Sequence, residues 1–172
     1  MILTNSEIKK QVEKGDIHIN PFSERNLNPN SYNYHLGDKI LEATNNIIDS
    51  KEKVIFKEIT LNEQGYMLFP QKLYLANTLE EIGSDIFVTS LIGRSSVGRL
   101  GIFLQITADL GQLGAKHCWT LELKVVQPVK VYPGMKIGQV SFWQALGFQS
   151  KKYFGKYGSY SDPHGSEIFN EF

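Results

Sequence analysis

Most of the chain alternates between apolar and polar positions, in short segments separated by Gly, Pro, Asn and Asp. The apolar positions are rich in β-branched and aromatic residues, and their period of two is typical of half-buried strands. Strands and long helices do not alternate, so the pattern favours an all-β sandwich or barrel over a βαβ fold. The segments with this pattern are 16–19, 32–44, 53–61, 66–82, 85–92, 101–110, 118–134 and 136–146.

One helix is predicted, close to the N-terminus. Thr4 is a suitable N-cap, and Glu7 three positions later completes a capping box. Leu3 and Ile8 have the spacing of a hydrophobic staple, and Gly15 is the expected end of the helix. No second helix is convincing, so the sequence predicts a mainly β fold with one short N-terminal helix.

Length and charge narrow the class of protein. The 172 residues suffice for one core, so 1–172 is predicted to be a single domain. The 18 basic and 18 acidic side chains cancel, which argues against a nucleic-acid partner. Cys118 is the only cysteine, which fits a reducing compartment. Because neither a signal peptide nor a long apolar run occurs, we expect a cytoplasmic protein without a membrane partner.

Residues 147–172, here called the tail, differ in composition from the rest of the chain. The tail is rich in Gly, Ser, Tyr and Lys. Such a composition is typical of a disordered terminus. Lysines and tyrosines among glycines also suit a flap that closes over a ligand. Composition alone leaves both interpretations open.

The segment GRSSVGRLG, residues 93–101, interrupts two apolar runs with two arginines, two serines and three glycines. Guanidinium and hydroxyl groups bind phosphate oxygens, and glycines allow a ligand to approach the backbone. The segment is not a Walker loop, and no helix is predicted to follow it. A polar turn whose arginines pair with surface carboxylates explains the local pattern equally well.

A glutamate stands within the apolar segment CWTLEL, residues 118–123. Strict alternation places Thr120 and Glu122 on one face and Trp119 with the two leucines on the other. Inside a cavity, Glu122 would suit general acid/base catalysis, because desolvation raises a carboxyl pKa. On an edge strand it would face solvent, and the local pattern alone favours this second interpretation.

The chain lacks the residues for metal-dependent deamination. Zinc nucleobase deaminases need a histidine and cysteines in an HxE…PCxxC arrangement. One cysteine and four scattered histidines cannot supply it, so neither zinc nor another protein-held metal is expected. A GxSxG nucleophile motif is also missing from the sequence.

Several motifs in order carry a family resemblance. GRSSVGRLGI, TLEL and PGMKIGQVSF resemble the deoxycytidine triphosphate (dCTP) deaminase branch of the trimeric dUTPase superfamily. MILTNSEIKKQVEKG, LNPNSYNYHLGD, YFGKY and the closing SEI are similar to that branch as well. The resemblance implies a dUTPase-like subunit, a distorted β-barrel or jelly roll. It also implies a homotrimer with sites between subunits.

The same resemblance implies a chemistry and assigns roles to residues. The family deaminates cytosine at C4 without zinc, and Mg²⁺ accompanies the triphosphate. Glu122 matches the general acid/base. Ser95 and the backbone carbonyl of Ala108 match the groups that hold the attacking water. Arg99 matches an arginine near both the carboxylate and the phosphates.

Further matches concern the triphosphate. Arg94 and Ser96 match phosphate contacts, and Arg94 is expected to reach into a neighbouring subunit's site. Tyr153 and Lys156 match a C-terminal flap, which would make residues 147–172 a lid over the active site.

Some positions depart from the family pattern. Gln112 stands where a loop resembling IDPGFxG usually has an aspartate that contacts the deoxyribose, and Asp109 is a candidate substitute. Tyr160 stands where the flap usually has a glutamine. Asn33 and His35 stand where the family has Asp and Arg, a difference expected to concern subunit packing.

The expected function is therefore hydrolysis of dCTP to dUTP and ammonia, with Glu122 activating the water. A bifunctional enzyme that forms dUMP and pyrophosphate is one alternative, and the missing loop aspartate counts against it. A deaminase of another cytosine nucleotide is a second alternative, motivated by Gln112 and Tyr160. A nucleotide-binding regulator without catalysis is the third.

Overall fold

Strands are the main regular structure of the computed structural model, which describes residues 1–104, 107–147, 151–155, 157–158 and 160–172. The elements are α1 (Asn5–Lys14), β1 (Ile17–Asn20), η1 (Glu24–Asn26), β2 (Leu27–Asn28), β3 (Ser31–Ala43), β4 (Phe56–Thr60), β5 (Tyr66–Leu68), β6 (Tyr74–Ser84), β7 (Phe87–Gly93), α2 (Ser95–Gly98), β8 (Ile102–Leu104), β9 (Leu110–Gly111), β10 (Lys116–Val125), β11 (Val129–Val131), β12 (Lys136–Gln144) and η2 (Ile168–Glu171).

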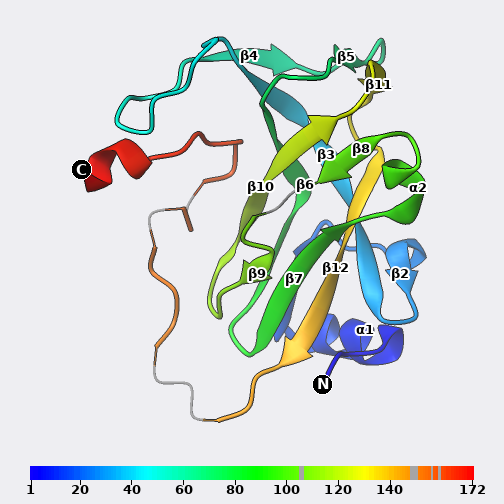
Figure 1. The fold of residues 1–172 in the computed structure, drawn as a ribbon. Helices are drawn as coiled ribbons and strands as arrows, with labels where there is room; N and C mark the ends of the chain where they lie inside the picture. The colour runs from blue at the N-terminus through cyan, green and yellow to red at the C-terminus, as the bar shows by residue number, and fades with distance from the viewer. Residues whose placement is uncertain (105–106, 148–150, 156, 159) are drawn as a thin grey trace.

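The main sheet is antiparallel and curls on itself (Figure 1). Its strand order is β8-β10-β6-β3-β12-β7-β9, with β1 added to β6, and β2 and β4 added to β3. The first part of β3 pairs with β12, as at Tyr32 and Val140, and its second part pairs with β6, as at Ile40 and Ala76. One long strand therefore joins the two sides of the curl, and the predicted dUTPase-like β architecture is confirmed.

The core lies inside this curl. Leu121 and Leu123 on β10 follow the period of two, whereas residues 31–34 at the start of β3 are all buried. Alternate residues of a strand point to opposite faces, so the intervening side chains remain available for the surface or for a site.

The N-terminal helix is confirmed, and its end is the predicted one. Gly15 adopts φ 80°, a left-handed conformation that suits a helix C-cap. The predicted capping box is wrong, because Thr4 makes no side-chain cap bond and the Glu7 carboxylate accepts a bond from the Gln11 amide instead. The expectation of no further helix is also wrong, since Ser95–Gly98 forms one turn, α2. Among the described residues, no helix is long and apolar enough to cross a membrane.

Candidate functional site

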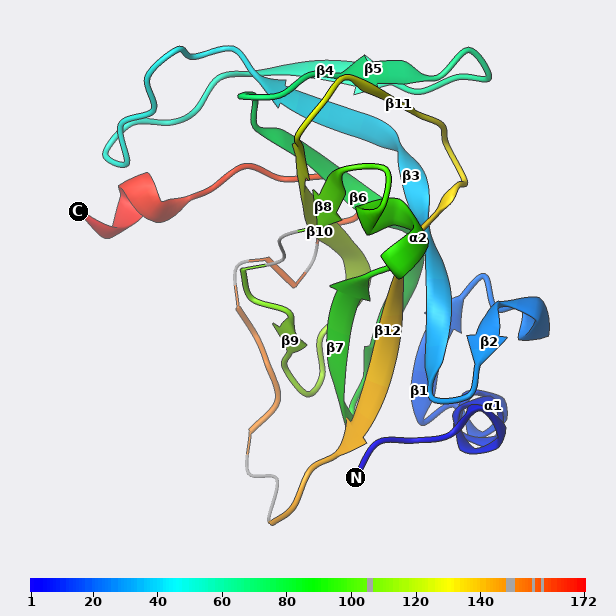
Figure 2. The same cartoon turned by 45° about the vertical axis from the view of Figure 1, so that its right-hand side comes forward.

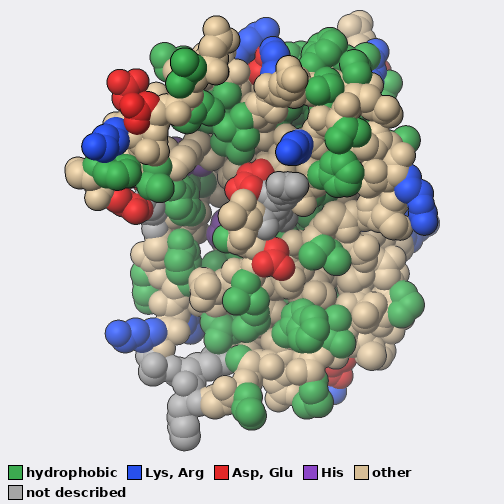
Figure 3. Space-filling model, viewed as in Figure 1, with side chains coloured by type: hydrophobic (Ala, Val, Ile, Leu, Met, Phe, Trp, Pro, Cys, Tyr) green, Lys and Arg blue, Asp and Glu red, His purple; other side chains and the backbone are tan. Residues whose placement is uncertain are grey.

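A cavity of about 660 Å³ lies beside β10. Its walls come from β10, the loop before it, the loop that leads into β4, and the tail. Figure 3 shows the surface hollowed beside the main body, with histidine side chains visible in the recess. Five of the predicted site residues line this cavity, namely Ala108, Gln112, Glu122, Tyr153 and Tyr160.

Glu122 is half-buried in the cavity wall. Its Oε2 atom accepts hydrogen bonds from the Thr107 backbone N–H at 3.3 Å and the Thr107 hydroxyl at 2.8 Å. Leu121 and Leu123 point into the core on the opposite face. Of the two interpretations, the position of Glu122 fits the cavity, whose other walls are the tail, the loop directly before β10 and the loop that leads into β4.

A β-bulge interrupts β10 just before Glu122. The pairing of β10 with β6 shifts register between Cys118 and Thr120. A bulge adds an unpaired residue and breaks strict alternation, and here four consecutive residues, 117–120, line the cavity. None of these four residues was predicted to belong to the site, and no local signal in the sequence marks the bulge.

Burial shapes the chemistry of two neighbouring wall residues. The His117 ring Nδ1 donates to the Cys118 carbonyl at 2.8 Å, and burial lowers the pKa of His117. Since a carbonyl can only accept, Nδ1 carries the proton of the neutral ring. Burial, reinforced by nearby carboxylates, raises the pKa of the Cys118 thiol to about 11. Neither residue is therefore charged at neutral pH.

The remaining charges of the cavity wall are negative. Asp49, Glu52 and Glu122 line it, and no Lys or Arg does so among the described residues. A triphosphate carries several negative charges and needs cationic partners. The described part of a single chain therefore lacks the phosphate-binding half of a nucleotide site within this cavity.

The arginine-bearing segment lies elsewhere. In Figures 1 and 2, α2 and the tail lie on opposite sides of the molecule. Val97 anchors α2 in the core, and Ser95, Ser96 and Arg99 are exposed. Because of this distance in space, the predicted phosphate contacts and Glu122 are not brought together within one chain.

Arg94 is held at the base of α2. Its Nη1 atom donates to the Lys136 carbonyl at 3.3 Å. Neither Arg94 nor the other predicted residues of α2 line the cavity.

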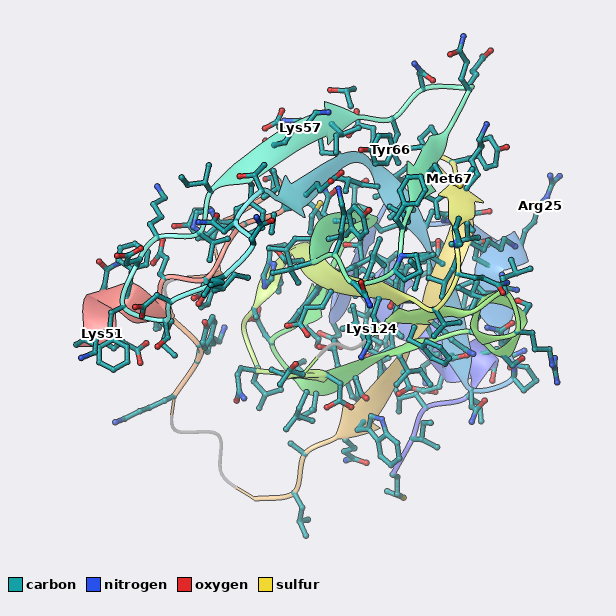
Figure 4. All side chains as sticks on the ribbon, turned by 45° about the horizontal axis from the view of Figure 1, so that its top comes forward. Arg25, Lys51, Lys57, Tyr66, Met67 and Lys124 are labelled. Atoms are coloured by element: carbon teal, nitrogen blue, oxygen red, sulfur yellow. The ribbon has the colours of Figure 1, made fainter. Side chains whose placement is uncertain are left out.

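The described residues of the tail lie against the body. The Tyr153 backbone N–H donates to the Leu113 carbonyl at 2.8 Å. At the far end, the Lys51 ammonium lies 5.5 Å from the centre of the Phe172 ring, and Figure 4 shows Lys51 beside η2. Lys156, predicted to contact phosphate, lies outside the described residues.

The loop before β10 carries Gln112, which departs from the family pattern, and Asp109, its candidate substitute. Gln112 is exposed and lines the cavity. Asp109 lies between two lining residues, Ala108 and Leu110, and its Oδ2 accepts a bond from the Ser90 hydroxyl at 3.2 Å.

The described residues contain no group of three or more His, Cys, Asp or Glu side chains that could hold a metal ion. Mg²⁺ usually keeps several waters and binds phosphate oxygens, so it can enter with a nucleotide without a protein cage.

A family model described as dCTP deaminase-like matches residues 2–145. The chain belongs to the dCTP deaminase-like family. This confirms both the suspected resemblance and the prediction of an enzyme.

Relatives within the dCTP deaminase-like family match over the whole chain. A protein of Hathewaya histolytica is 44% identical over 172 residues, which is 100% of this chain and 99% of that one. Proteins of Clostridium acetobutylicum and Leptospira biflexa are 40% and 39% identical over 100% of this chain and cover 99% and 98% of their own lengths. All three are named "dCTP deaminase, dUMP-forming".

A solved structure from Agrobacterium tumefaciens, titled a 2'-deoxycytidine 5'-triphosphate deaminase, has the same fold. It superposes with a TM-score of 0.67 over 84% of this chain at 19% identity. The match spans about half, 48%, of the length of that chain.

The names of the relatives correct one expectation from the sequence. We expected the reaction to end at dUTP, and that prediction is wrong, because the full-length relatives are named for forming dUMP. The objection to a bifunctional enzyme came from Gln112 at the position of the family's loop aspartate, and the names of the relatives outweigh it.

Proposed function

We propose that this chain hydrolyses dCTP to dUMP, ammonia and pyrophosphate. The observation that carries the proposal is the Glu122 carboxylate in the wall of a nucleotide-sized cavity, held by two bonds from Thr107. The end product rests on the dUMP-forming relatives, the first of them 44% identical over the full length.

In the first step, Glu122 acts as the general acid/base. It accepts a proton from a water whose oxygen bonds to cytosine C4, and it passes that proton to ring N3. The remaining water proton moves to the amino group, the C4–N bond breaks, and ammonia leaves with the bonding electrons. A carbonyl then forms at C4. We propose that the Ala108 carbonyl and Ser95 hold the water.

The phosphates need a second copy of the chain. The lining of the cavity is acidic, while Arg94 and Arg99 lie on α2, away from it. In a cyclic assembly, the same surface of one copy can complete the site of the next. We therefore propose a homotrimer in which Arg94, Ser95, Ser96 and Arg99 of one copy serve the cavity of its neighbour.

For the second step, we propose Asp109 as the carboxylate that activates water. The hydroxyl of this water joins the α-phosphorus, and pyrophosphate leaves as the anhydride bond breaks. Asp109 follows Ala108 directly and has an exposed side chain, so it can approach a nucleotide bound beside that residue.

The tail and its neighbours would complete the site. We propose residues 147–172 as a flap of the single domain 1–172, with Tyr153, Lys156 and Tyr160 on the nucleotide side and Gln112 near the sugar. Mg²⁺ would enter on the triphosphate and offset part of its charge, without a protein cage.

The test is an assay of purified protein with dCTP, dUTP, CTP, dCMP and Mg²⁺, following ammonia and pyrophosphate separately. We expect both products from dCTP, in equal amounts. Asp109→Asn should retain ammonia release and accumulate dUTP. Turnover of another cytosine nucleotide in preference to dCTP, or nucleotide binding without any product, would overturn the proposal.

A further inference from the structure

Two residues on neighbouring strands bind the backbone of the tail. Asn77 on β6 and Thr120 on β10 are direct cross-strand partners. The Asn77 side-chain amide donates to the Ser161 carbonyl at 2.9 Å. The Thr120 hydroxyl accepts from the His164 backbone N–H at 3.3 Å. This pair of strands therefore holds the tail at two main-chain atoms three residues apart.

The segment between and beside these contacts, Ser161–Gly165, is here called the docking segment. Asp162 forms an ion pair of 2.7 Å with Lys39 on β3, and Pro163 is buried. Gly165 lies so close to Phe56 that an added Cβ would be 2.7 Å from the ring. Charge, burial and close approach thus reinforce the two hydrogen bonds.

The Asn77 contact is costly to lose. Asn77 exposes only 7% of its surface, and its Oδ1 atom is buried without a partner among the described residues. The docking segment supplies the partner of the amide nitrogen, and a hydrogen bond of this kind contributes about 1 kcal/mol net. The sheet therefore favours the docked tail.

Docking places an aromatic unit in the cavity wall. His164 stacks on Tyr160 with ring centres 3.8 Å apart and planes at 8°. The Glu167 Oε1 atom bonds both rings, accepting from the Tyr160 hydroxyl at 2.9 Å and contacting His164 Nε2 at 3.0 Å. Tyr160 and His164 both line the cavity. The Tyr160 hydroxyl is therefore hydrogen-bonded within the tail, to Glu167.

The docking point is close to the candidate acid/base group. Thr120 and Glu122 lie on the same face of β10, and residues two apart on a strand are separated by about 7 Å. Both line the cavity. The other end of the tail is held independently, by Lys152 on Asp85 at 3.2 Å.

We propose that Asn77 and Thr120 are positioning residues. They hold the tail beside Glu122, so that Tyr160 and His164 of the tail close the cavity. This inference rests on the proposed function for its effect on turnover. It adds to the flap two fixed points, at Lys152 near the start of the tail and at the docking segment near its end.

The test compares Thr120→Val with Thr120→Ser in the full-length protein. Valine has a similar shape and suits a strand, but it cannot accept the His164 N–H, whereas serine can. We expect Thr120→Val to raise KM for dCTP about fivefold to tenfold, the effect of one hydrogen bond, with a smaller change in kcat. Thr120→Ser should restore the wild-type KM.

Hydrogen exchange provides the second measurement. Amides of residues 161–167 should exchange about tenfold faster in Thr120→Val than in wild type or Thr120→Ser. Unchanged exchange, or faster exchange without any rise in KM, overturns the inference. If no variant turns over dCTP, the proposed function fails while the exchange rates still decide whether Thr120 holds the tail.

Discussion

β10 and the α2 region carry two groups of proposed site residues, and these groups differ in surroundings and in charge. Glu122 on β10 is half-buried in a cavity whose described wall contains carboxylates but neither Lys nor Arg. Arg99 on α2 is exposed and lies outside that cavity. The difference teaches that one chain presents the reacting group and the phosphate-binding groups on separate surfaces. The proposed homotrimer would bring the two surfaces together.

The largest effect should come from removing the carboxylate of the cavity. Glu122→Gln keeps the side-chain size and abolishes proton transfer, so we expect ammonia release from dCTP to fall by about 10²–10⁴-fold. Steady-state kinetics measures this, with oligomer size and circular dichroism as controls. A variant with the wild-type rate would remove Glu122 from the reaction.

Cys118 can report on the enclosure of the cavity wall. Burial holds the pKa of this thiol at about 11, against an ordinary value of 9.0. We expect alkylation by iodoacetamide at pH 8 to be about 100-fold slower than for a free cysteine, because the thiolate reacts. Saturating dCTP should slow the alkylation of Cys118 further. Alkylation as fast as that of a small-molecule thiol would show that the cavity wall is open.

Mixed assemblies test whether the two surfaces meet. We expect Glu122→Gln and Arg99→Ala each to be impaired alone, for different reasons. After unfolding and refolding the two together, about one site in four would combine an intact Glu122 with an intact Arg99 from the neighbouring copy. Partial recovery of ammonia release is therefore expected. No recovery would mean that both residues must come from the same chain.

The smallest effect concerns His117 and pH. Burial lowers its pKa below the ordinary value of 6.5, so the unfolded chain takes up a proton before the folded one as pH falls. This contribution to stability is complete above pH 6.5 and is lost as pH falls through the lowered pKa. In His117→Gln, the free energy of unfolding should decrease less on acidification than in wild type. The difference should be about 1 kcal/mol or less, since the ring is partly exposed to solvent. Denaturant unfolding of both proteins at pH 8 and pH 5 measures this difference. An equal decrease in the free energy of unfolding in wild type and variant would contradict the prediction.

Local patterns predicted much of the fold. The period of two located the strands, and Gly15 marked the end of α1 because a left-handed cap needs glycine. The local pattern gave a wrong prediction where neighbouring polar side chains compete for the same hydrogen-bond partners. At the start of α1, Asn5 Oδ1 binds the Ser6 N–H and the Glu7 carboxylate binds Gln11, so no capping box forms.

By itself, the sequence determined the β class, the alternation that turns Glu122 away from the core, and the family to which the chain belongs. These follow from neighbouring residues and short motifs. The tertiary structure alone decided which residues surround Glu122. The register of β10 on β6, the bulge before Thr120 and the docking of His164 all depend on contacts between residues far apart in the sequence, such as Thr120 with Asn77 and with His164. Such pairings are set by the packing of the whole fold, and no periodic pattern in the sequence marks them.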